Sequence, residues 1–226
     1  MPSLAERYQA VSTEVADAIS AAGRDATDVE LIVISKNHGA ELVRELYALG
    51  QRHFGENRDQ EAKPKAAETS DLAGITWHFV GQLQSNKTKS ALSYTNVLHS
   101  IDRASLVSSL KRELQGRPER LSGFIQLNLT DDPGRGGIEP KHLTDFATSL
   151  LELESFDLLG VMGVAALDRD PRIDFETIAE ASAQLRLLEP KARFISAGMS
   201  HDFRPAIEFG ATHLRIGTAI TGKRNL

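Results

Sequence analysis

The residue best suited to covalent chemistry is Lys36, which follows the apolar run of residues 31–34 and precedes a helical pattern at 41–46. An apolar run of this length, bounded by polar residues, predicts a strand that is buried on both faces. In α/β sheets and barrels, ligands bind at the carboxyl ends of such strands. A lysine after a strand is more often a solvated loop residue. Lys36 is therefore a candidate for ligand attachment only if other strand ends support it.

Two further segments, residues 196–202 and 215–220, combine glycine with hydroxyl and cationic side chains at the ends of the last two predicted strands. The residues suited to an anion there are Ser200, Arg215, Gly217 and Thr218. Barrels commonly bind phosphate with the loops after strands seven and eight, through backbone N–H groups and a helix N-terminus. Glycine and hydroxyl residues also make ordinary turns, and Arg215 is equally able to pair with Asp202 or Glu208. A phosphate site is predicted if both segments share one face.

A lysine and a phosphate-binding site at the same end of the barrel favour a ligand that is an aldehyde and carries a phosphate. An amine must be neutral to attack a carbonyl, and burial or a neighbouring cation increases its neutral fraction. The attack yields a Schiff base. Pyridoxal 5′-phosphate (PLP) meets both requirements, and so does an aldolase-type substrate, so the residues alone leave these two ligands open.

Alternating strand and helix patterns must position these residues. Strands are predicted at 31–36, 53–54, 76–80, 97–99, 124–128, 158–162, 193–195 and 213–216. Helical patterns fall at 58–69, 85–92, 103–115, 140–151, 173–188 and 202–209, with caps expected at Ser85, Asp102 and His201-Asp202. Eight strands, each followed by a helix, predict an α/β fold of the (β/α)₈ TIM-barrel type, as one domain over residues 1–226. An open doubly wound sheet is the alternative, but the first strand lacks its glycine fingerprint. A capping box at Ser3 and Glu6 predicts an extra N-terminal helix.

Composition excludes several other classes of protein. The formal net charge is -5 without a long run of either sign, so nothing points to a nucleic-acid partner or an anionic membrane. No stretch is apolar enough to span a membrane, and the first residues lack a signal-peptide core, so a cytoplasmic location is expected. The chain has no cysteine, which rules out disulfides, thiolate nucleophiles and cysteine-bound metals.

Several ordered blocks of sequence carry a family resemblance. They are Val33-Ile34-Ser35-Lys36, Phe54-Gly55-Glu56-Asn57, residues 77–87 (WHFVGQLQSNK), residues 99–103 (HSIDR), Gly160-Val161-Met162, residues 198–202 (GMSHD) and residues 215–220 (RIGTAI). In these blocks the chain resembles the YggS/PROSC family of PLP-homeostasis proteins along nearly its whole length. The resemblance implies a barrel like the N-terminal domain of alanine racemase, with PLP held as an internal aldimine on Lys36.

The same resemblance implies roles for six further residues. Phosphate contacts are expected from Ser200, Gly217 and Thr218. Arg215 is expected near the ring or the phosphate, and Asn57 and Met199 in the pocket wall. Three positions depart from the family. His38 and Arg135 stand where the family often has lysine, and Thr221 where it usually has phenylalanine. The change at His38 puts in doubt a second lysine that hands PLP on, and Arg135 keeps the charge but cannot form an aldimine.

The expected function is PLP binding in intracellular PLP homeostasis, without substantial turnover. Racemisation needs acid/base groups on both faces of the cofactor, and Lys36 serves one. A tyrosine from a second domain serves the other face in alanine racemase-like enzymes, and we expect no such domain here. A weakly active amino-acid racemase-like enzyme is the first alternative.

A metal-dependent hydrolase on the same barrel is a distant second alternative. It would use His53, His78, His99 and His213, but their spacing fits no metal site and core histidines are commoner. PLP-dependent apoenzymes are conceivable partners that the sequence does not name. A monomer is expected because no surplus apolar segment calls for burial.

Overall fold

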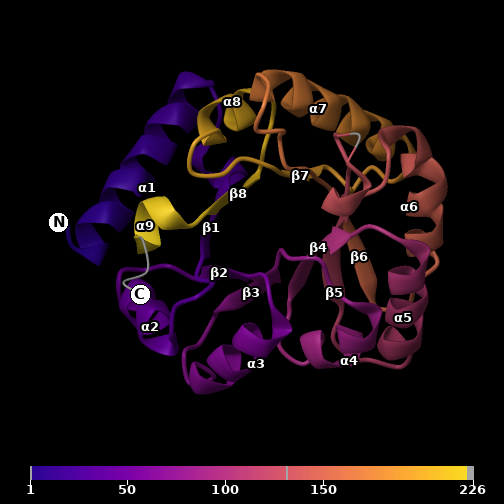
Figure 1. Cartoon of the computed structure of the whole chain (residues 1–226), viewed down its shortest axis with the longest axis horizontal. Coiled ribbons are helices and arrows are strands. Elements are labelled where there is room, and N and C mark those ends of the chain that lie inside the picture. The colour runs from indigo at the N-terminus through magenta and orange to yellow at the C-terminus, as the bar shows by residue number, and fades with distance from the viewer. Residues whose placement is uncertain (1, 131, 223–226) are drawn as a thin grey trace.

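The eight parallel strands of the chain close into a barrel in the order β1 to β8 (Figure 1). The structure is a computed structural model that describes residues 2–130 and 132–222. The strands are β1 (Glu30–Ile34), β2 (His53–Glu56), β3 (Thr76–Phe79), β4 (Val97–Ile101), β5 (Leu121–Gln126), β6 (Phe156–Met162), β7 (Phe194–Ser196) and β8 (His213–Ile216). β1 pairs with β8 as well as with β2, so the ring has no free edge. The predicted (β/α)₈ TIM barrel is confirmed.

Helices surround the barrel on its outside (Figure 1). The α-helices are α1 (Leu4–Ala21), α2 (Ala40–Ala48), α3 (Asp59–Glu68), α4 (Thr88–Ala91), α5 (Ala104–Leu114), α6 (Leu143–Leu151), α7 (Pro171–Leu188), α8 (Phe203–Glu208) and α9 (Thr218–Thr221). Short 3₁₀ turns are η1 (Ala26–Asp28), η2 (Ser85–Lys87), η3 (Pro133–Arg135) and η4 (Pro140–His142). The extra N-terminal helix is α1, and α9 is a short helix after β8 that the sequence did not predict.

Local signals explain where several helices begin. The Ser3 hydroxyl accepts from the Glu6 N–H at 3.2 Å and the Glu6 carboxylate accepts from the Ser3 N–H at 2.6 Å, which confirms the predicted capping box. The caps expected at Ser85 and Asp102 were wrong by one residue. The capping position of η2 is Gln84, and that of α5 is Arg103. Asp102 does not cap α5, because its carboxylate already accepts a hydrogen bond from Arg103 Nη1.

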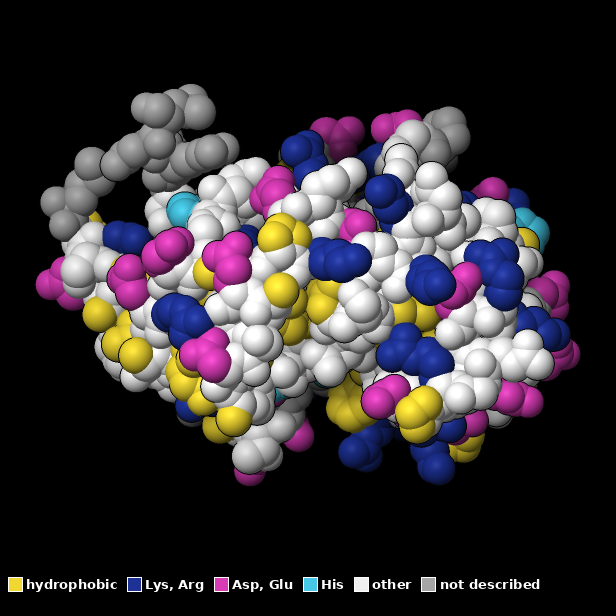
Figure 2. Space-filling model, turned by 90° about the horizontal axis from the view of Figure 1, so that it is seen from below, with side chains coloured by type: hydrophobic (Ala, Val, Ile, Leu, Met, Phe, Trp, Pro, Cys, Tyr) yellow, Lys and Arg dark blue, Asp and Glu magenta, His cyan; other side chains and the backbone are white. Residues whose placement is uncertain are grey.

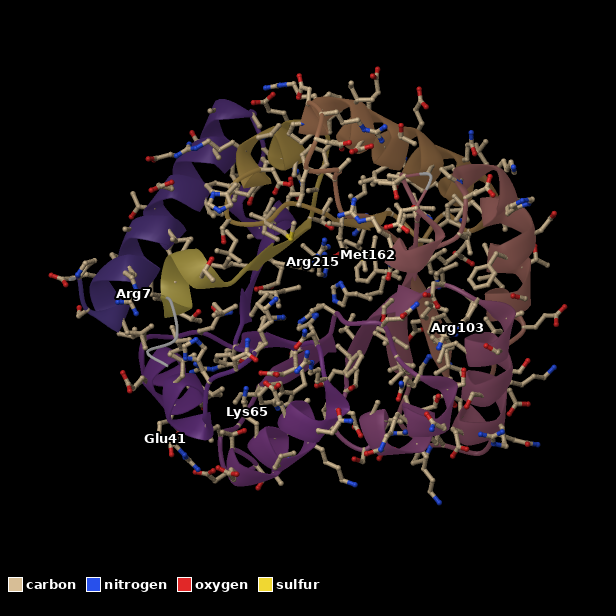
Figure 3. All side chains as sticks on the ribbon, in the orientation of Figure 1. Arg7, Glu41, Lys65, Arg103, Met162 and Arg215 are labelled. Carbon is tan, nitrogen blue, oxygen red and sulfur yellow. The ribbon has the colours of Figure 1, made fainter. Side chains whose placement is uncertain are left out.

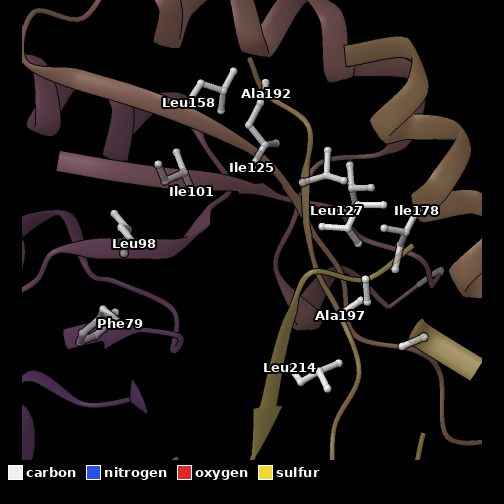
Figure 4. Close-up of a cluster of buried hydrophobic side chains, with 14 of the residues drawn as sticks. Phe79, Leu98, Ile101, Ile125, Leu127, Leu158, Ile178, Ala192, Ala197 and Leu214 are labelled. Atoms are coloured by element: carbon white, nitrogen blue, oxygen red, sulfur yellow. The ribbon is translucent and has the colours of Figure 1, made fainter. Parts of the chain in front are cut away.

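The apolar core lies between the strands and the helix ring. Buried side chains from the outer strand faces pack against the inward faces of the helices, as Phe79, Leu98, Ile125, Leu158 and Leu214 illustrate (Figure 4). Burial at about 25 cal/mol per Å² makes this layer the main source of stability. No helix of the described residues has the length and apolar character needed to cross a membrane.

The barrel interior is filled differently, with the rings of histidine and phenylalanine side chains. Side chains from six strands meet there: His53, His78, His99, Phe124, Phe194 and His213. His99 lies 4.7 Å from Phe124 and His213 lies 5.6 Å from Phe194, measured between ring centroids. His99 of β4 also lies 6.3 Å from His213 of β8. Side chains of strands that are not neighbours can meet in this way only in the lumen, because successive side chains alternate between the lumen and the helix layer.

Candidate functional site

The predicted site residues come from four consecutive strand ends of the barrel. In the order β7, β8, β1, β2, these ends carry Met199 and Ser200, then Arg215, Gly217 and Thr218, then Lys36, then Asn57. The pairing of Ile32 with Arg215 and of Ile34 with Gly55 keeps the four ends level. All seven residues therefore lie along one arc of the barrel mouth.

Lys36 stands at the first central position of a tight turn. The His38 N–H donates to the Ser35 carbonyl at 3.2 Å, and Asn37 has a φ of 65°. Asparagine tolerates this left-handed conformation better than most residues. The Asn37 N–H donates to Glu61 Oε2 at 2.8 Å, which ties the turn to α3. The Lys36 side chain is exposed, on a backbone that these hydrogen bonds hold at the carboxyl end of β1.

A buried ion pair that the sequence reasoning missed supports this turn from behind. Lys65 on α3 donates to the Ser35 carbonyl at 2.9 Å and to Glu56 Oε1, and the Ser35 hydroxyl donates to the same Glu56 oxygen at 2.7 Å. Burial raises the pKa of Glu56, against the lowering effect of the Lys65 ammonium. Glu56 Oε2 is buried without a hydrogen-bond partner. A polar triplet in the apolar layer therefore fixes the residue that precedes Lys36.

The loop after β7 is held by its own hydrogen bonds. The Met199 N–H donates to Asp202 Oδ1 at 2.5 Å, and the Asp202 N–H donates back to the Met199 carbonyl at 3.2 Å. The Arg215 N–H donates to the Gly198 carbonyl at 2.9 Å. Met199 and Ser200 are half-buried, so both side chains can be reached from the mouth.

The turn after β8 brings backbone close to β1. A Cβ added at Gly217 would lie 3.4 Å from the Cβ of Ile34. Gly217 caps the N-terminus of α9, where Thr218 is exposed. At the other end of α9, Arg7 Nε donates to the Ile220 carbonyl at 2.7 Å, which fastens the turn to α1 (Figure 3). Free N–H groups of a first helical turn and a nearby hydroxyl are suited to phosphate oxygens.

Arg215 lies at the floor of the mouth, near the centre of the barrel in Figure 3, and is 5% exposed. Its Nη1 donates to Ser196 Oγ at 2.5 Å and its Nη2 to the Gly163 carbonyl at 2.9 Å. Burial lowers the pKa of Arg215 to about 10, and the field of Asp202 opposes that shift.

The expected alternative of an Arg215 ion pair with Asp202 or Glu208 was wrong. Glu208 pairs with Arg172 at 2.6 Å, and no carboxylate oxygen of residues 2–130 and 132–222 comes within 4.0 Å of the Arg215 guanidinium. A buried charge without an ion partner is costly. The site would therefore gain from an anionic or electron-rich ligand, and a phosphorylated aldehyde fits it.

Asn57 lines a cavity of about 560 Å³ next to the mouth, between the ends of β2 and β3. Other residues in its wall include Glu61, Gln82, Leu83 and Lys87. A Cβ at Gly81 would lie 2.1 Å from the Asn57 carbonyl oxygen, so the glycine lets the two strand ends approach. Asn57 is thus held in place by its neighbour, with its side chain half-buried.

The lumen histidines hydrogen-bond to other side chains instead of converging on one point. His53 Nδ1 lies 3.0 Å from His78 Nε2, and His78 Nδ1 lies 2.8 Å from His99 Nε2. Within the described part of the chain, no group of three or more His, Asp and Glu side chains has an arrangement that could hold a metal ion. The geometry gives no support to a metal-dependent hydrolase.

The hydroxyl groups of the three tyrosines all donate to other groups of the protein. The Tyr8 hydroxyl donates to Gln51 Oε1 at 3.1 Å, and the Tyr47 hydroxyl to the Ala73 carbonyl at 3.0 Å. The Tyr94 hydroxyl donates to Asp59 Oδ1 at 3.2 Å, and burial beside that carboxylate raises the pKa of Tyr94.

Comparison with known sequences points to one family. The sequence profile described as "Alanine racemase, N-terminal domain" matches residues 13–225. The pyridoxal phosphate homeostasis protein of Mycobacterium tuberculosis H37Rv is 35% identical, over 99% of this chain and 93% of that protein. The protein of the same description from Escherichia coli K12 is 33% identical, over 100% of this chain and 98% of that protein.

Comparison with solved structures points to the same family. PipY of Synechococcus elongatus, solved with PLP bound, is 36% identical with a TM-score of 0.81, over 92% of this chain and 100% of that chain. Alanine racemase of Corynebacterium glutamicum is 14% identical with a TM-score of 0.68, over 96% of this chain and 61% of that chain. The racemase shares only the fold.

Proposed function

Because the chain belongs to the family of pyridoxal phosphate homeostasis proteins, we propose that it binds PLP at the barrel mouth through Lys36 and serves in PLP homeostasis. One observation carries the proposal. Lys36 and the anion-binding groups around Arg215 lie on adjacent strands, β1 and β8, and Arg215 is a buried cation that lacks a carboxylate partner. A phosphorylated aldehyde supplies a carbonyl for the Lys36 amine and an anion for the groups around Arg215.

Each residue has a defined part in this binding. The Lys36 amine condenses with the aldehyde, forming a C=N bond (a Schiff base) and releasing one water. The N–H groups of the Gly217–Thr218 turn and the hydroxyls of Ser200 and Thr218 hold the phosphate. Arg215 donates to the ring or the phosphate from below.

Asn57 and Met199 complete the pocket as its side walls. Both are half-buried and belong to the two outer strand ends of the arc, those of β2 and β7. When bound, PLP supplies an electron sink that would stabilise a carbanion at an amino-acid Cα. The residues of this chain hold it at the mouth.

Storage and delivery fit the site better than efficient turnover. Proton transfer on both faces of the cofactor needs a second acid or base. The three tyrosines, the residue type that plays this part in alanine racemase-like enzymes, are hydrogen-bonded elsewhere. Incubation with L-amino acids in deuterium oxide tests this point: clear Lys36-dependent exchange at Cα would favour the racemase-like alternative instead.

The binding proposal is tested by the visible absorption of the purified protein before and after borohydride reduction. We expect a PLP band in the wild type that reduction fixes to the protein, and its loss in Lys36→Ala. Lys63→Ala is the matched control, because Lys63 is an exposed lysine on α3. An unchanged band in Lys36→Ala, or no PLP bound by the wild type, would refute the proposal.

We further infer that residues 1–226 work as one unit, as a monomer in the cytoplasm, with PLP-dependent apoenzymes as partners. Acidic and basic side chains intermingle on the face in Figure 2, with only small apolar areas between them. Of the exposed large apolar side chains, Leu49, Leu151 and Leu167 come from separate parts of the chain, whereas Ile173, Leu187 and Leu188 lie on α7, the first near its start and the other two at its end. Size-exclusion chromatography coupled to light scattering tests the monomer, and fractionation of cells tests the location.

A further inference from the structure

A continuous chain of hydrogen bonds crosses the barrel lumen below the cofactor mouth. It starts at Arg215, whose Nη1 donates to Ser196 Oγ at 2.5 Å. Ser196 Oγ lies 2.8 Å from His99 Nδ1, and His99 Nε2 lies 2.8 Å from His78 Nδ1. Ser196 and His99 are 0% exposed and His78 is 2% exposed, so water does not interrupt this part of the chain.

The chain continues to the opposite end of the barrel. His78 Nε2 lies 3.0 Å from His53 Nδ1, and His53 Nε2 lies 3.4 Å from Glu30 Oε2. Glu30 begins β1, at the end of the barrel away from the mouth, and its side chain is 43% exposed. The chain therefore runs from a buried cation at the mouth to a carboxylate at the far surface.

Burial favours the neutral form of the three imidazoles in this chain of hydrogen bonds. Burial lowers the pKa of His78 and of His99 well below 6.5, with smaller effects of neighbouring charged groups, and burial also lowers the pKa of His53. His213 faces the same rings without joining the chain, and burial lowers its pKa to about 4. A neutral imidazole has one donor nitrogen and one acceptor nitrogen.

The two ends of the chain select one direction for its hydrogen bonds. A guanidinium only donates and a carboxylate only accepts. If each imidazole carries its proton on Nε2, the Ser196 hydroxyl donates to His99, and each ring donates onward until His53 donates toward Glu30. The opposite direction would leave the Ser196 proton without an acceptor among the described residues and would set a bare His53 nitrogen against the carboxylate.

We propose that Ser196, His99, His78 and His53 form a one-way hydrogen-bond relay that positions the Arg215 guanidinium under the cofactor. Ser196 can offer a fixed acceptor to Arg215 only if its own proton is committed to His99. The orientation of Arg215 is thereby set by rings that never touch the ligand. This inference rests on the proposed function for the identity of the ligand, but the direction of the relay is a property of the protein alone.

Nitrogen-15 NMR of histidine side chains in the full chain, with PLP bound and with PLP removed, tests the direction. We expect the Nε2–H tautomer for His53, His78 and His99 in both states. In Glu30→Gln we expect His53 to keep the Nε2–H tautomer, because the glutamine oxygen can still accept and His53 Nδ1 still accepts from His78. An Nδ1–H tautomer at His53, His78 or His99 in the wild type would overturn the relay whether or not the protein binds PLP.

PLP binding then tests the positioning role. Ser196→Ala removes the acceptor of a charged donor, so we expect PLP binding at least about tenfold weaker and a shifted absorption band. Ser182→Ala is the control, because it deletes a buried hydroxyl on α7, outside the barrel. Wild-type affinity and band in Ser196→Ala would refute the positioning role, while the wild-type PLP band would still support the proposed function.

A conservative pair at His99 separates positioning from packing. Glutamine has one acceptor and one donor end, so His99→Gln can pass the hydrogen bond from Ser196 to His78 in the same direction. His99→Leu fills similar space without doing so. We expect the wild-type absorption band in His99→Gln and the shifted band of Ser196→Ala in His99→Leu. The same absorption band in His99→Gln and His99→Leu, at equal thermal stability, would contradict the proposal.

Discussion

The buried Lys65–Glu56 pair gives a sharp test of how the turn of Lys36 is held. In Lys65→Met the methionine fills the space of the lysine stem, but Glu56 keeps only the Ser35 hydroxyl as a partner. Both side chains are nearly inaccessible, with 4% exposure for Lys65 and 1% for Glu56. Removing one member of such a pair leaves an uncompensated charge and typically costs about 3–5 kcal/mol.

Urea unfolding followed by circular dichroism measures this loss. For a urea slope of about 2–3 kcal/mol/M, we expect the midpoint of Lys65→Met to fall by roughly 1–2 M. Lys63→Met, on the exposed face of the same helix, should change the free energy of unfolding by less than about 0.5 kcal/mol. The double variant Glu56→Gln/Lys65→Met should recover most of the loss, because glutamine still accepts from Ser35 without a charge.

The pH dependence of the single variant follows from the raised pKa of Glu56. A carboxyl group whose folded-state pKa is raised stabilises the fold below its unfolded pKa, and that stability is lost as pH rises through the folded pKa. Removing Lys65 removes the main influence that lowers this pKa. Lys65→Met should therefore become more stable as pH falls from 7 toward 5. A loss below about 1 kcal/mol at pH 7, or a double variant no better than the single one, would refute the reasoning.

Three further predictions concern the mouth and the lumen. Gly81→Ala should lower the free energy of unfolding by about 1–3 kcal/mol and weaken PLP binding, because the new Cβ would meet the Asn57 carbonyl. Urea unfolding measures the first effect and PLP titration the second. An unchanged PLP affinity would contradict the prediction. Arg7→Met should lower the free energy of unfolding by about 1–3 kcal/mol, because the Ile220 carbonyl of α9 loses its donor. We also expect weaker PLP binding in a PLP titration. Full PLP affinity would show that α9 needs no support from α1. Phe124→Ala should cost about 3–5 kcal/mol by thermal unfolding, because this fully buried ring fills the lumen; a loss below about 1 kcal/mol would mean that the rings around it repack.

Much of the architecture followed from the sequence. The alternation of strand-like and helix-like segments gave all eight strands. Apolar runs such as 31–34 and 158–162 were the clearest signals, because a strand buried on both faces has a continuous apolar sequence. The ends of the helices were less predictable. Asp102 is a good capping residue, but its carboxylate binds Arg103 and Gln82, so a tertiary contact decides where α5 begins.

Seven residues of the mouth were named before their positions were known, and the barrel brings them to adjacent strand ends. The supporting contacts were not predictable. Lys65 looks like any polar residue of a helix, and only the packing of α3 against β2 buries it beside Glu56. His78 and His99 lie 21 residues apart in the sequence. The β3–β4 register places His78 opposite Val97, two residues before His99, and this pairing brings the two rings within hydrogen-bond distance.

The ring closure of the barrel also has a consequence for biosynthesis. β1 and Lys36 leave the ribosome early, but β8 and α9 leave it after every other strand and helix of the barrel, and Arg7 joins Ile220 across 213 positions of sequence. Contacts at such separation form late, because the intervening loop must close first. A nascent chain therefore exposes the Lys36 amine long before it has the turn after β8 that we propose to bind phosphate. Tight capture of PLP would begin only when synthesis of the barrel is complete, so cofactor loading would report that the ring has closed.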